Sequence, residues 1–246
     1  MRLIGLPVFI LYTYAGTGWA APKNSPPPAA PEKPAAAPAW SVQVSSPPAS
    51  AEELVAHFQK LDQALQSLSA GFEQKVHLTA SGIEQKVEGQ VQYQKPNHLR
   101  VEHRSPEQQT IVTDGKSLWI HRHVHKQVIQ THLDEWRKQD PWLNSLLDMG
   151  QYAKLAENYN LSWDTHTLTA SFKPKTGASF ELRMRLKGPS FFPNETILEM
   201  ENMRIESRLR DLKLNPKLKA ELFQFDIPKD VEVLPFKTNS RGETPP

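Results

Sequence analysis

"GFEQKVHLTASGIEQKVEGQVQYQ", residues 71–94, contains two runs in which the side chains alternate in polarity. In the first run Phe72 and Val76 alternate with charged residues, and in the second Val91 and Tyr93 alternate with glutamines. A period of two is typical of a strand with one buried face and one wet face. The Ser-Gly pair between the runs is a turn signal. Strand, turn and strand with no intervening helix predict an antiparallel hairpin.

The same alternation extends outward in both directions. "LRVEH", "QTIVT", "FELRMRL", "ETILEMEN" and "RIESRLRDLKL" repeat it between turn signals, and "ELFQFDIPKDVEVLPF" ends the pattern with a short edge strand. Arg183 and Glu199 are expected on the outer face, with Leu182 and Leu198 pointing inward. We therefore predict a mainly β (α+β) fold. It is an open, strongly curved antiparallel sheet, a half-barrel of about 10–11 strands, whose concave face is broad and apolar.

Two segments are expected to be helical. Ser50 and Glu53 form a capping-box pattern before an apolar stripe of helical spacing. This helix either packs on a core or acts as an apolar lid. A second helix is expected around 140–156, where Asp140 precedes Pro141 at the first helical position. With so few helices available, either they fill the curved sheet tightly or they leave an apolar cavity.

The N-terminal part of the chain is expected to direct export. Arg2 precedes a short apolar run, and Gly18 and Ala20 suit cleavage after Ala20, so residues 1–20 are predicted to be a signal peptide. The alternative, an uncleaved anchor, would need about 20 apolar residues. Residues 21–50 are rich in proline and alanine and are predicted to be a disordered arm. Deleting residues 21–48 is then expected to leave the thermal transition nearly unchanged.

The remaining sequence is predicted to form one domain over 51–236, followed by a flexible tail over 237–246. The chain has no cysteine, which excludes disulfides, thiolate metal ligands, a cysteine nucleophile and a bacterial lipid anchor. Its formal charge is +2 with scattered basic residues, which argues against nucleic acid as a partner. We find no motif for a nucleophile elbow, a phosphate loop, a dinucleotide or a zinc protease. The sequence therefore predicts neither an enzyme nor a cofactor.

Several fragments together resemble the periplasmic outer-membrane lipoprotein carriers, the LolA family. "SLSAGFEQKV", "GQVQYQKPNHLRVE", "TDGKSLWIHRHVHKQV" and "LFQFDIPKDVEV" match in order and at compatible spacing, from about 52 to 234. The resemblance implies an open antiparallel barrel whose hydrophobic hollow is capped by helices. It also implies a monomeric carrier in the periplasm of a Gram-negative bacterium. Such a carrier takes acylated lipoproteins from an inner-membrane ABC transporter to an outer-membrane lipoprotein acceptor.

The resemblance also implies the residues of the site. The family's arginine before Pro-Asn, which latches the lid by hydrogen bonding, is Lys95 here, and lysine lacks the planar fork of arginine. The lid is expected to be buried only partly or exchangeably, since acyl chains have to replace it. The expected lining of cavity and lid is Leu54, Phe58, Leu61, Leu65, Phe72, Val91, Tyr93, Leu99, Val101, Trp119, Trp142, Leu143, Leu146, Leu147, Phe180, Met184, Leu198 and Met200.

The free energy of burying acyl chains favours their exchange between two apolar environments, a membrane and the protein. Three acyl chains carry on the order of 45 methylenes, and their full burial from water would exceed about 30 kcal/mol, beyond the roughly 20 kcal/mol at which affinities saturate. Transfer from a membrane is nearly neutral, so docking and lid energies can set its direction. Two alternatives stay open: a divergent paralogue that carries another lipid, and a periplasmic lipoprotein-sensing regulator or scaffold whose sheet is filled.

Three histidines at 121, 123 and 125 raise the question of a metal site. In one continuous strand His121, His123 and His125 would share a face and could bind a metal. In the LolA family this segment instead turns near 122–124 and returns as a second strand. His121 and His125 are then expected to lie on opposite strands of the hairpin, and we predict no bound metal.

Overall fold

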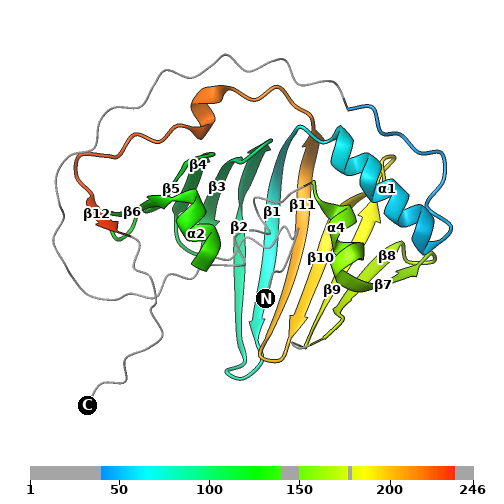
Figure 1. Ribbon diagram of the computed structural model, residues 1–246. Helices are drawn as coiled ribbons and strands as arrows, with labels where there is room; N and C mark the ends of the chain where they lie inside the picture. The colour runs from blue at the N-terminus through cyan, green and yellow to red at the C-terminus, as the bar shows by residue number, and fades with distance from the viewer. Residues whose placement is uncertain (1–39, 140–149, 177–178, 236–246) are drawn as a thin grey trace.

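The computed structural model of this protein describes residues 40–139, 150–176 and 179–235, and it is dominated by one open sheet of twelve strands (Figure 1). Their order along the sheet is β12-β6-β5-β4-β3-β2-β1-β11-β10-β9-β8-β7. The strands are β1 (Ser67–Leu78), β2 (Ile83–Gln94), β3 (His98–Ser105), β4 (Gln109–Asp114), β5 (Ser117–Arg122), β6 (Gln127–His132), β7 (Tyr159–Asp164), β8 (Thr169–Pro174), β9 (Phe180–Lys187), β10 (Phe192–Met200), β11 (Met203–Leu214) and β12 (Glu232–Pro235). The predicted mainly β fold is confirmed, with slightly more strands than expected.

All neighbouring strands are antiparallel except β12, which pairs in parallel with β6 at one edge. Tight turns join most of them, as their sequences indicate. In the turn between β4 and β5, Gly115 has a φ of +90°, which side chains with a Cβ rarely adopt. The Asp114 carboxylate accepts the backbone N–H groups of Lys116 and Ser117 at 2.8 and 2.7 Å. This Asp-Gly pair therefore fixes the register of the hairpin.

The helices are α1 (Ala51–Ala64), α2 (Leu133–Gln139), α4 (Tyr152–Asn158) and the 3-10 turn η1 (Ala220–Phe223). The predicted capping of α1 is confirmed, because Ser50 Oγ accepts the Glu53 N–H at 3.2 Å. The second helix was predicted to begin at Asp140. Residues 140–149 lie outside the described part, and α4 begins at Tyr152. None of the described helices is long and apolar enough to cross a membrane.

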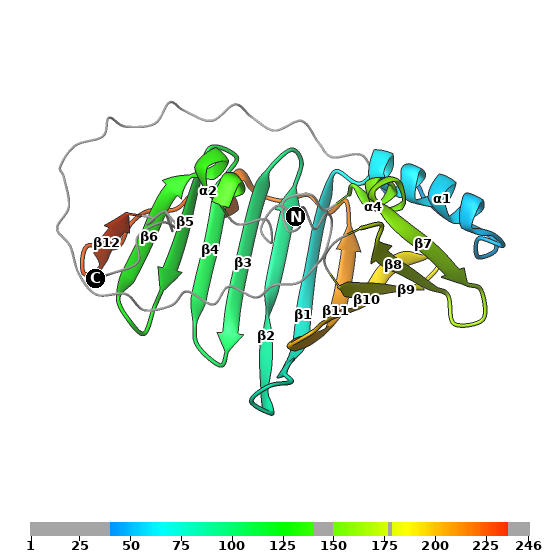
Figure 2. The same ribbon diagram turned by 60° about the horizontal axis from the view of Figure 1, so that its bottom comes forward.

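The alternation of side chains gives the sheet two different faces. Val91, Val101, Ile111 and Ile120 lie opposite one another on β2 to β5 and are at most 1% exposed. They belong to one apolar face, the concave face, toward which the sheet curves and on which α1, α2 and α4 lie (Figure 1). Figure 2 shows these helices at one end of the strands, with the β1–β2, β3–β4 and β5–β6 turns at the other end.

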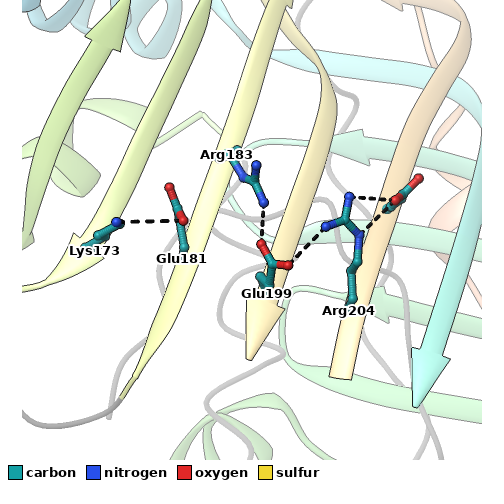
Figure 3. Close-up of polar contacts among 6 residues, drawn as sticks. Lys173, Glu181, Arg183, Glu199 and Arg204 are labelled. Carbon is teal, nitrogen blue, oxygen red and sulfur yellow. Dashed lines mark hydrogen bonds and ion pairs between the residues drawn. The ribbon is translucent and has the colours of Figure 1, made fainter. Parts of the chain in front are cut away.

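The opposite, convex face is charged, as the sequence indicates. On β9 to β11, Arg183 pairs with Glu199, which also accepts a hydrogen bond from Arg204 at 3.0 Å (Figure 3). Arg204 bonds further to Glu206 at 2.9 Å. These side chains are partly exposed, and such pairs contribute about 0–1 kcal/mol each to stability. These charged side chains therefore make the convex face favourable to expose to solvent, which leaves the concave face as the one that packs against the helices.

A C-terminal strap, residues 215–235, crosses the convex face of β3 to β6. Phe223 packs edge-on against His98 with ring centroids 5.4 Å apart, and Phe225 stacks on Trp119 at 6.1 Å. Beyond these contacts β12 extends the sheet beside β6. The predicted short edge strand is therefore present, and the strap that leads to it covers apolar groups on the outside of the sheet.

The last part of the predicted arm, residues 40–50, contacts the domain although it forms no helix or strand. Trp40 packs edge-on against Phe192 with ring centroids 6.3 Å apart, and Val44 N–H bonds to the Pro189 carbonyl at 3.2 Å. Trp40 is apolar enough to join the core although its neighbours are prolines and alanines. Deletion of residues 21–48 would remove this contact, so an unchanged thermal transition is no longer expected. Residues 21–39 lie outside the described part.

Candidate functional site: the concave face and its helices

Most of the expected lining residues lie on the concave face. Those that are buried there from β1 to β3 are Phe72, Val91, Tyr93, Leu99 and Val101. On β9 and β10 the buried ones are Phe180, Met184 and Leu198, while Met200 is partly buried at the end of β10. The register brings these side chains into neighbouring rows, because opposed residues of antiparallel strands point to the same face.

The placement of Trp119 in the cavity is wrong. Its neighbours Leu118 and Ile120 are buried on the concave face, so alternation turns Trp119 to the convex face. There it stacks on Phe225 of the C-terminal strap. The sequence carried this signal, because Leu118 and Ile120 continue the apolar pattern of β5, whereas Trp119 was assigned to the cavity as part of the resemblance.

Helix α1 presents its whole apolar stripe to the protein. Leu54, Phe58, Leu61 and Leu65 are each 0% exposed. The Phe58 ring lies 5.8 Å from that of Tyr152 on α4 and 6.4 Å from that of Phe172 on β8. The stripe is therefore completely buried in this conformation, so of the two expected forms of burial only exchangeable burial applies to it. Whether acyl chains exchange with the stripe stays a prediction.

Asp62 joins α1 to α4. Its two carboxylate oxygens accept the backbone N–H groups of Tyr152 and Ala153, each at 2.8 Å. N–H groups in the first turn of a helix have no partner within the helix itself, so this carboxylate of α1 caps α4. Burial raises the pKa of Asp62, while the two backbone hydrogen bonds and the nearby Lys95 oppose that shift. The two helices thus form one unit across the end of the sheet. The contact made by Asp62 could not be predicted from the alternation of apolar residues.

Lys95, which the resemblance places at the position of the family's latch arginine, contacts α1. Its ammonium group donates to the backbone carbonyl of Asp62, and its backbone N–H bonds to the Gln66 carbonyl at 2.9 Å. Burial lowers the pKa of Lys95, and the Asp62 carboxylate opposes this. A Cβ on Gly150 would lie 3.3 Å from the Lys95 ammonium nitrogen. Lys95 therefore reaches the junction of α1, the β2–β3 turn and the segment before α4.

The two ends of α1 are held differently. At the C-terminal end, the Asn215 side chain accepts the N–H of Gln66 at 2.8 Å and donates to the Ala64 carbonyl at 2.9 Å. Toward the N-terminal end, His57 Nε2 lies 3.1 Å from the Phe191 carbonyl oxygen. The C-terminal end is therefore continuous with the sheet through several hydrogen bonds. At the other end the Pro48 carbonyl, just before α1, accepts a hydrogen bond from Trp163 Nε1 on β7 at 2.9 Å, so this contact and that of His57 must break before α1 can open.

Replacing Lys95 with methionine should weaken the attachment of α1. The variant keeps the length of the chain but loses a hydrogen bond from a charged donor, which contributes about 1.5–3 kcal/mol. We expect a loss of about 1–2 kcal/mol in the free energy of unfolding, measured in urea, because the side chain is only half-buried. Lys95→Arg, which keeps the donors, should lose less. Equal stability of Lys95→Met and the wild type would show that the hydrogen bond from Lys95 does not stabilise the attachment of α1.

His57 should make the stability depend on pH. Burial lowers its pKa, with Lys60 adding to the effect and the carbonyls of Phe191 and Ser190 opposing it. The unfolded chain takes up the proton near pH 6.5, before the folded state does, so stability is complete above about pH 6.5 and falls below it. His98 and His121 shift in the same direction. The loss in unfolding free energy between about pH 7.5 and 5.5 should therefore be smaller in His57→Gln than in the wild type. Equal losses would contradict this role.

The histidine-rich segment forms a hairpin, as the resemblance implies. β5 ends at Arg122 and β6 begins at Gln127, so His121 lies in a strand while His123 and His125 lie in the turn. His125 was expected on the second strand, and its position in the turn corrects that expectation; His121 is paired with Val128. His123 Nε2 lies 2.9 Å from Thr110 Oγ1. Among the described residues, no group of three or more histidine or acidic side chains is arranged to hold a metal ion. The absence of bound metal stays a prediction.

Four expected lining residues, Trp142, Leu143, Leu146 and Leu147, lie outside the described part. Conversely, sequence reasoning missed Tyr152, Phe172 and Phe192, whose rings meet Phe58 or one another. Aromatic residues at buried strand positions were a usable signal for Phe172 and Phe192. The short helix that carries Tyr152 has too few residues to show a clear period.

An open antiparallel half-barrel with an apolar concave face and hydrogen-bonded helices across one end defines a class of binding proteins. The family model of the outer membrane lipoprotein carrier protein LolA matches residues 63–226, and the chain belongs to this family. An outer-membrane lipoprotein carrier protein of Glaesserella parasuis is 28% identical over 182 residues, covering 71% of this chain and 81% of that protein. One of Idiomarina loihiensis is 27% identical over 175 residues, covering 71% and 84%. The crystal structure of a LolA superfamily protein from Nitrosomonas europaea is 15% identical with a TM-score of 0.48, covering 72% and 98%.

Proposed function

We propose that this protein is a periplasmic carrier that holds the acyl chains of lipoproteins on its concave face, beneath α1 and α4. The observation that carries the proposal is the joint placement of a broad apolar face and a helix pair whose apolar stripe packs across one end of it. The membership in the carrier family supports the same reading. The carrier would receive its cargo from an inner-membrane ABC transporter and deliver it to an outer-membrane acceptor. It acts by binding and release and needs no chemical step.

The energy of opening is compatible with this exchange. Detaching α1 exposes four fully buried side chains, Leu54, Phe58, Leu61 and Leu65. At about 1.5–3 kcal/mol each, the cost is on the order of 10 kcal/mol, which burial of about a dozen methylenes would offset. For a lipopeptide taken up from water, one acyl chain of ordinary length is therefore enough to replace the stripe. A chain that arrives from a membrane gains little by the transfer, so in that case docking to the donor has to supply the energy of opening. A peptide without an acyl chain offers no such compensation.

A binding experiment tests the proposal. A fluorescent triacylated lipopeptide should bind to the purified protein, whereas the same peptide without acyl chains should not. Bound lipopeptide should also pass to acceptor vesicles faster in the presence of the protein than without it. No difference between the acylated and the plain peptide would contradict a carrier function.

The complete burial of the α1 stripe favours one second candidate, a scaffold or regulator in which the sheet is permanently filled. In that case the protein would bind neither the lipopeptide nor an apolar dye at any concentration at which it stays folded. The two functions therefore separate in the same experiment.

A further inference from the structure

A row of polar side chains crosses the apolar concave face. On β10, β11 and β1, Thr196 lies opposite Ser207, which lies opposite Gln74. All three side chains are buried, at 2%, 6% and 2% exposure. Gln74 Nε2 donates to Ser207 Oγ at 2.8 Å. The adjacent positions of the same face on β1 and β11 are apolar, so three polar groups in one row are unexpected from the pattern of the rest of the face. These positions are Phe72, Val76, Ile205 and Leu209.

Two further polar groups lie on the far side of β2, in the adjacent row toward the helices, because Gln74 is paired with Val87 while His103 is paired with Gly89. His103 on β3 lies opposite Gln109 on β4, with His103 Nδ1 3.2 Å from Gln109 Oε1. Phe72 lies between the two groups: its ring covers Gly89, where a Cβ would come within 2.4 Å of it, and meets the His103 ring edge-on at 5.7 Å. We call Thr196, Ser207, Gln74, His103 and Gln109 the polar belt.

The polar belt divides the concave face into two apolar parts. Toward the end that carries the helices lie the rows of Val91 and Tyr93 with their partners on β3 to β5. Toward the hairpin turns lie Val76, Ile205 and Leu198, which are opposed on β1, β11 and β10. A molecule that lies along the strands with its apolar part under the helices therefore passes the belt.

Thr196 Oγ1 has no hydrogen-bond partner within the described part of the chain, although it is shielded from solvent. The residues opposite it are Ser207 and Met184. Buried hydroxyl groups are nearly always hydrogen-bonded, and an unpaired one is costly compared with a methyl group of the same shape. A valine would fit a buried strand position at least as well. A hydroxyl here is therefore explained best by a partner that is bound only part of the time.

We propose that the polar belt binds the ester and amide carbonyl groups of an acylated ligand, with Thr196 as the principal donor. The acyl chains then extend toward α1 and α4. The belt offers neutral donors and no lysine or arginine, which suits a neutral carbonyl rather than a phosphate or a free carboxylate. The first cation along the row, Arg122, lies beyond Gln109 on β5. This inference rests on the proposed function and adds to it the polar contact that would set the depth and register of the chains.

The test compares two ligands that differ only in their carbonyl groups: a diacylglyceryl lipopeptide with ester links and its dialkyl ether analogue. The wild type should prefer the ester, and Thr196→Val should lose about five- to tenfold in affinity for the ester, as expected for one buried hydrogen bond. Its affinity for the ether should stay unchanged, and its thermal transition should stay unchanged or rise. Ser207→Ala should lose the same preference. Thr110→Val, on the convex face, is the matched control and should keep it.

Two outcomes would overturn the proposal: equal binding of ester and ether by the wild type, or an unchanged ester preference in both Thr196→Val and Ser207→Ala. Either result leaves the proposed function intact as long as both ligands bind. If the wild type binds neither lipid, the proposed function itself fails and the polar belt proposal fails with it.

Discussion

A covalent link between α1 and the β9–β10 turn should abolish the uptake of acylated cargo. The C-terminal end of α1 is pinned by Asn215 and Lys95, so opening requires its N-terminal half to move. His57 on that half lies within hydrogen-bond distance of the Phe191 carbonyl, and the backbone of Ser190 is adjacent. His57→Cys combined with Ser190→Cys can therefore be bridged by a short thiol-specific reagent. The chain has no cysteine of its own, so only this pair reacts.

The linked protein should lose at least about 90% of its lipopeptide binding, because the link prevents α1 from moving off the concave face. Without the link this movement exposes the apolar stripe at a cost of about 10 kcal/mol. With a cleavable reagent, reduction should restore binding. Each single cysteine variant treated in the same way is the control for modification without a bridge. If the bridged protein takes up cargo as fast as the reduced one, α1 is not the gate.

Truncation of Phe58 to alanine should destabilise the domain by about 3–5 kcal/mol, as for other phenylalanines in packed cores. Phe58 is fully buried and meets the rings of Tyr152 and Phe172, so the cavity left behind cannot be filled by solvent. The free energy of unfolding in urea measures this loss. Gln59→Ala changes an exposed residue of the same helix and should shift stability by less than about 0.5 kcal/mol.

A small effect of Phe58→Ala, comparable with that of Gln59→Ala, would mean that α1 is detached from the sheet in solution. Saturating lipopeptide distinguishes the roles further. Because cargo replaces the α1 stripe, the cost of Phe58→Ala should be smaller in the loaded protein than in the free protein. A filled scaffold would show the full cost under both conditions.

The fold was predictable where the physical signal is local. Alternation identified the strands around Val91 and Leu198, and the Ser50–Glu53 pattern identified the start of α1. These signals are strong because each depends on a few neighbouring residues. The role of Trp40 was not predicted, because it depends on a strand distant in sequence, at Phe192. The face of Trp119 follows from the local alternation, which the assignment to the cavity did not use.

The candidate site was predictable in part for the same reason. The apolar lining of β1 to β3 follows from alternation, and Lys95 was identified only through the resemblance to a family. The capping of α4 by Asp62 and the polar belt involve residues that each look ordinary in sequence. Ser207 and Thr196 become a row only through the pairing of β10 with β11. Such contacts become visible only once the register of the sheet is known.

Photo-cross-linking with a lipopeptide that carries a diazirine in one acyl chain tests the central claim most directly. After irradiation and digestion, mass spectrometry identifies the residues that carry the adduct. Acyl chains on the concave face should label residues such as Val91, Val101 and Ile120, and unlabelled lipopeptide should compete for them. Adducts concentrated on the convex face, at Trp119 or Phe225, would contradict the account, as would labelling that unlabelled lipopeptide does not reduce.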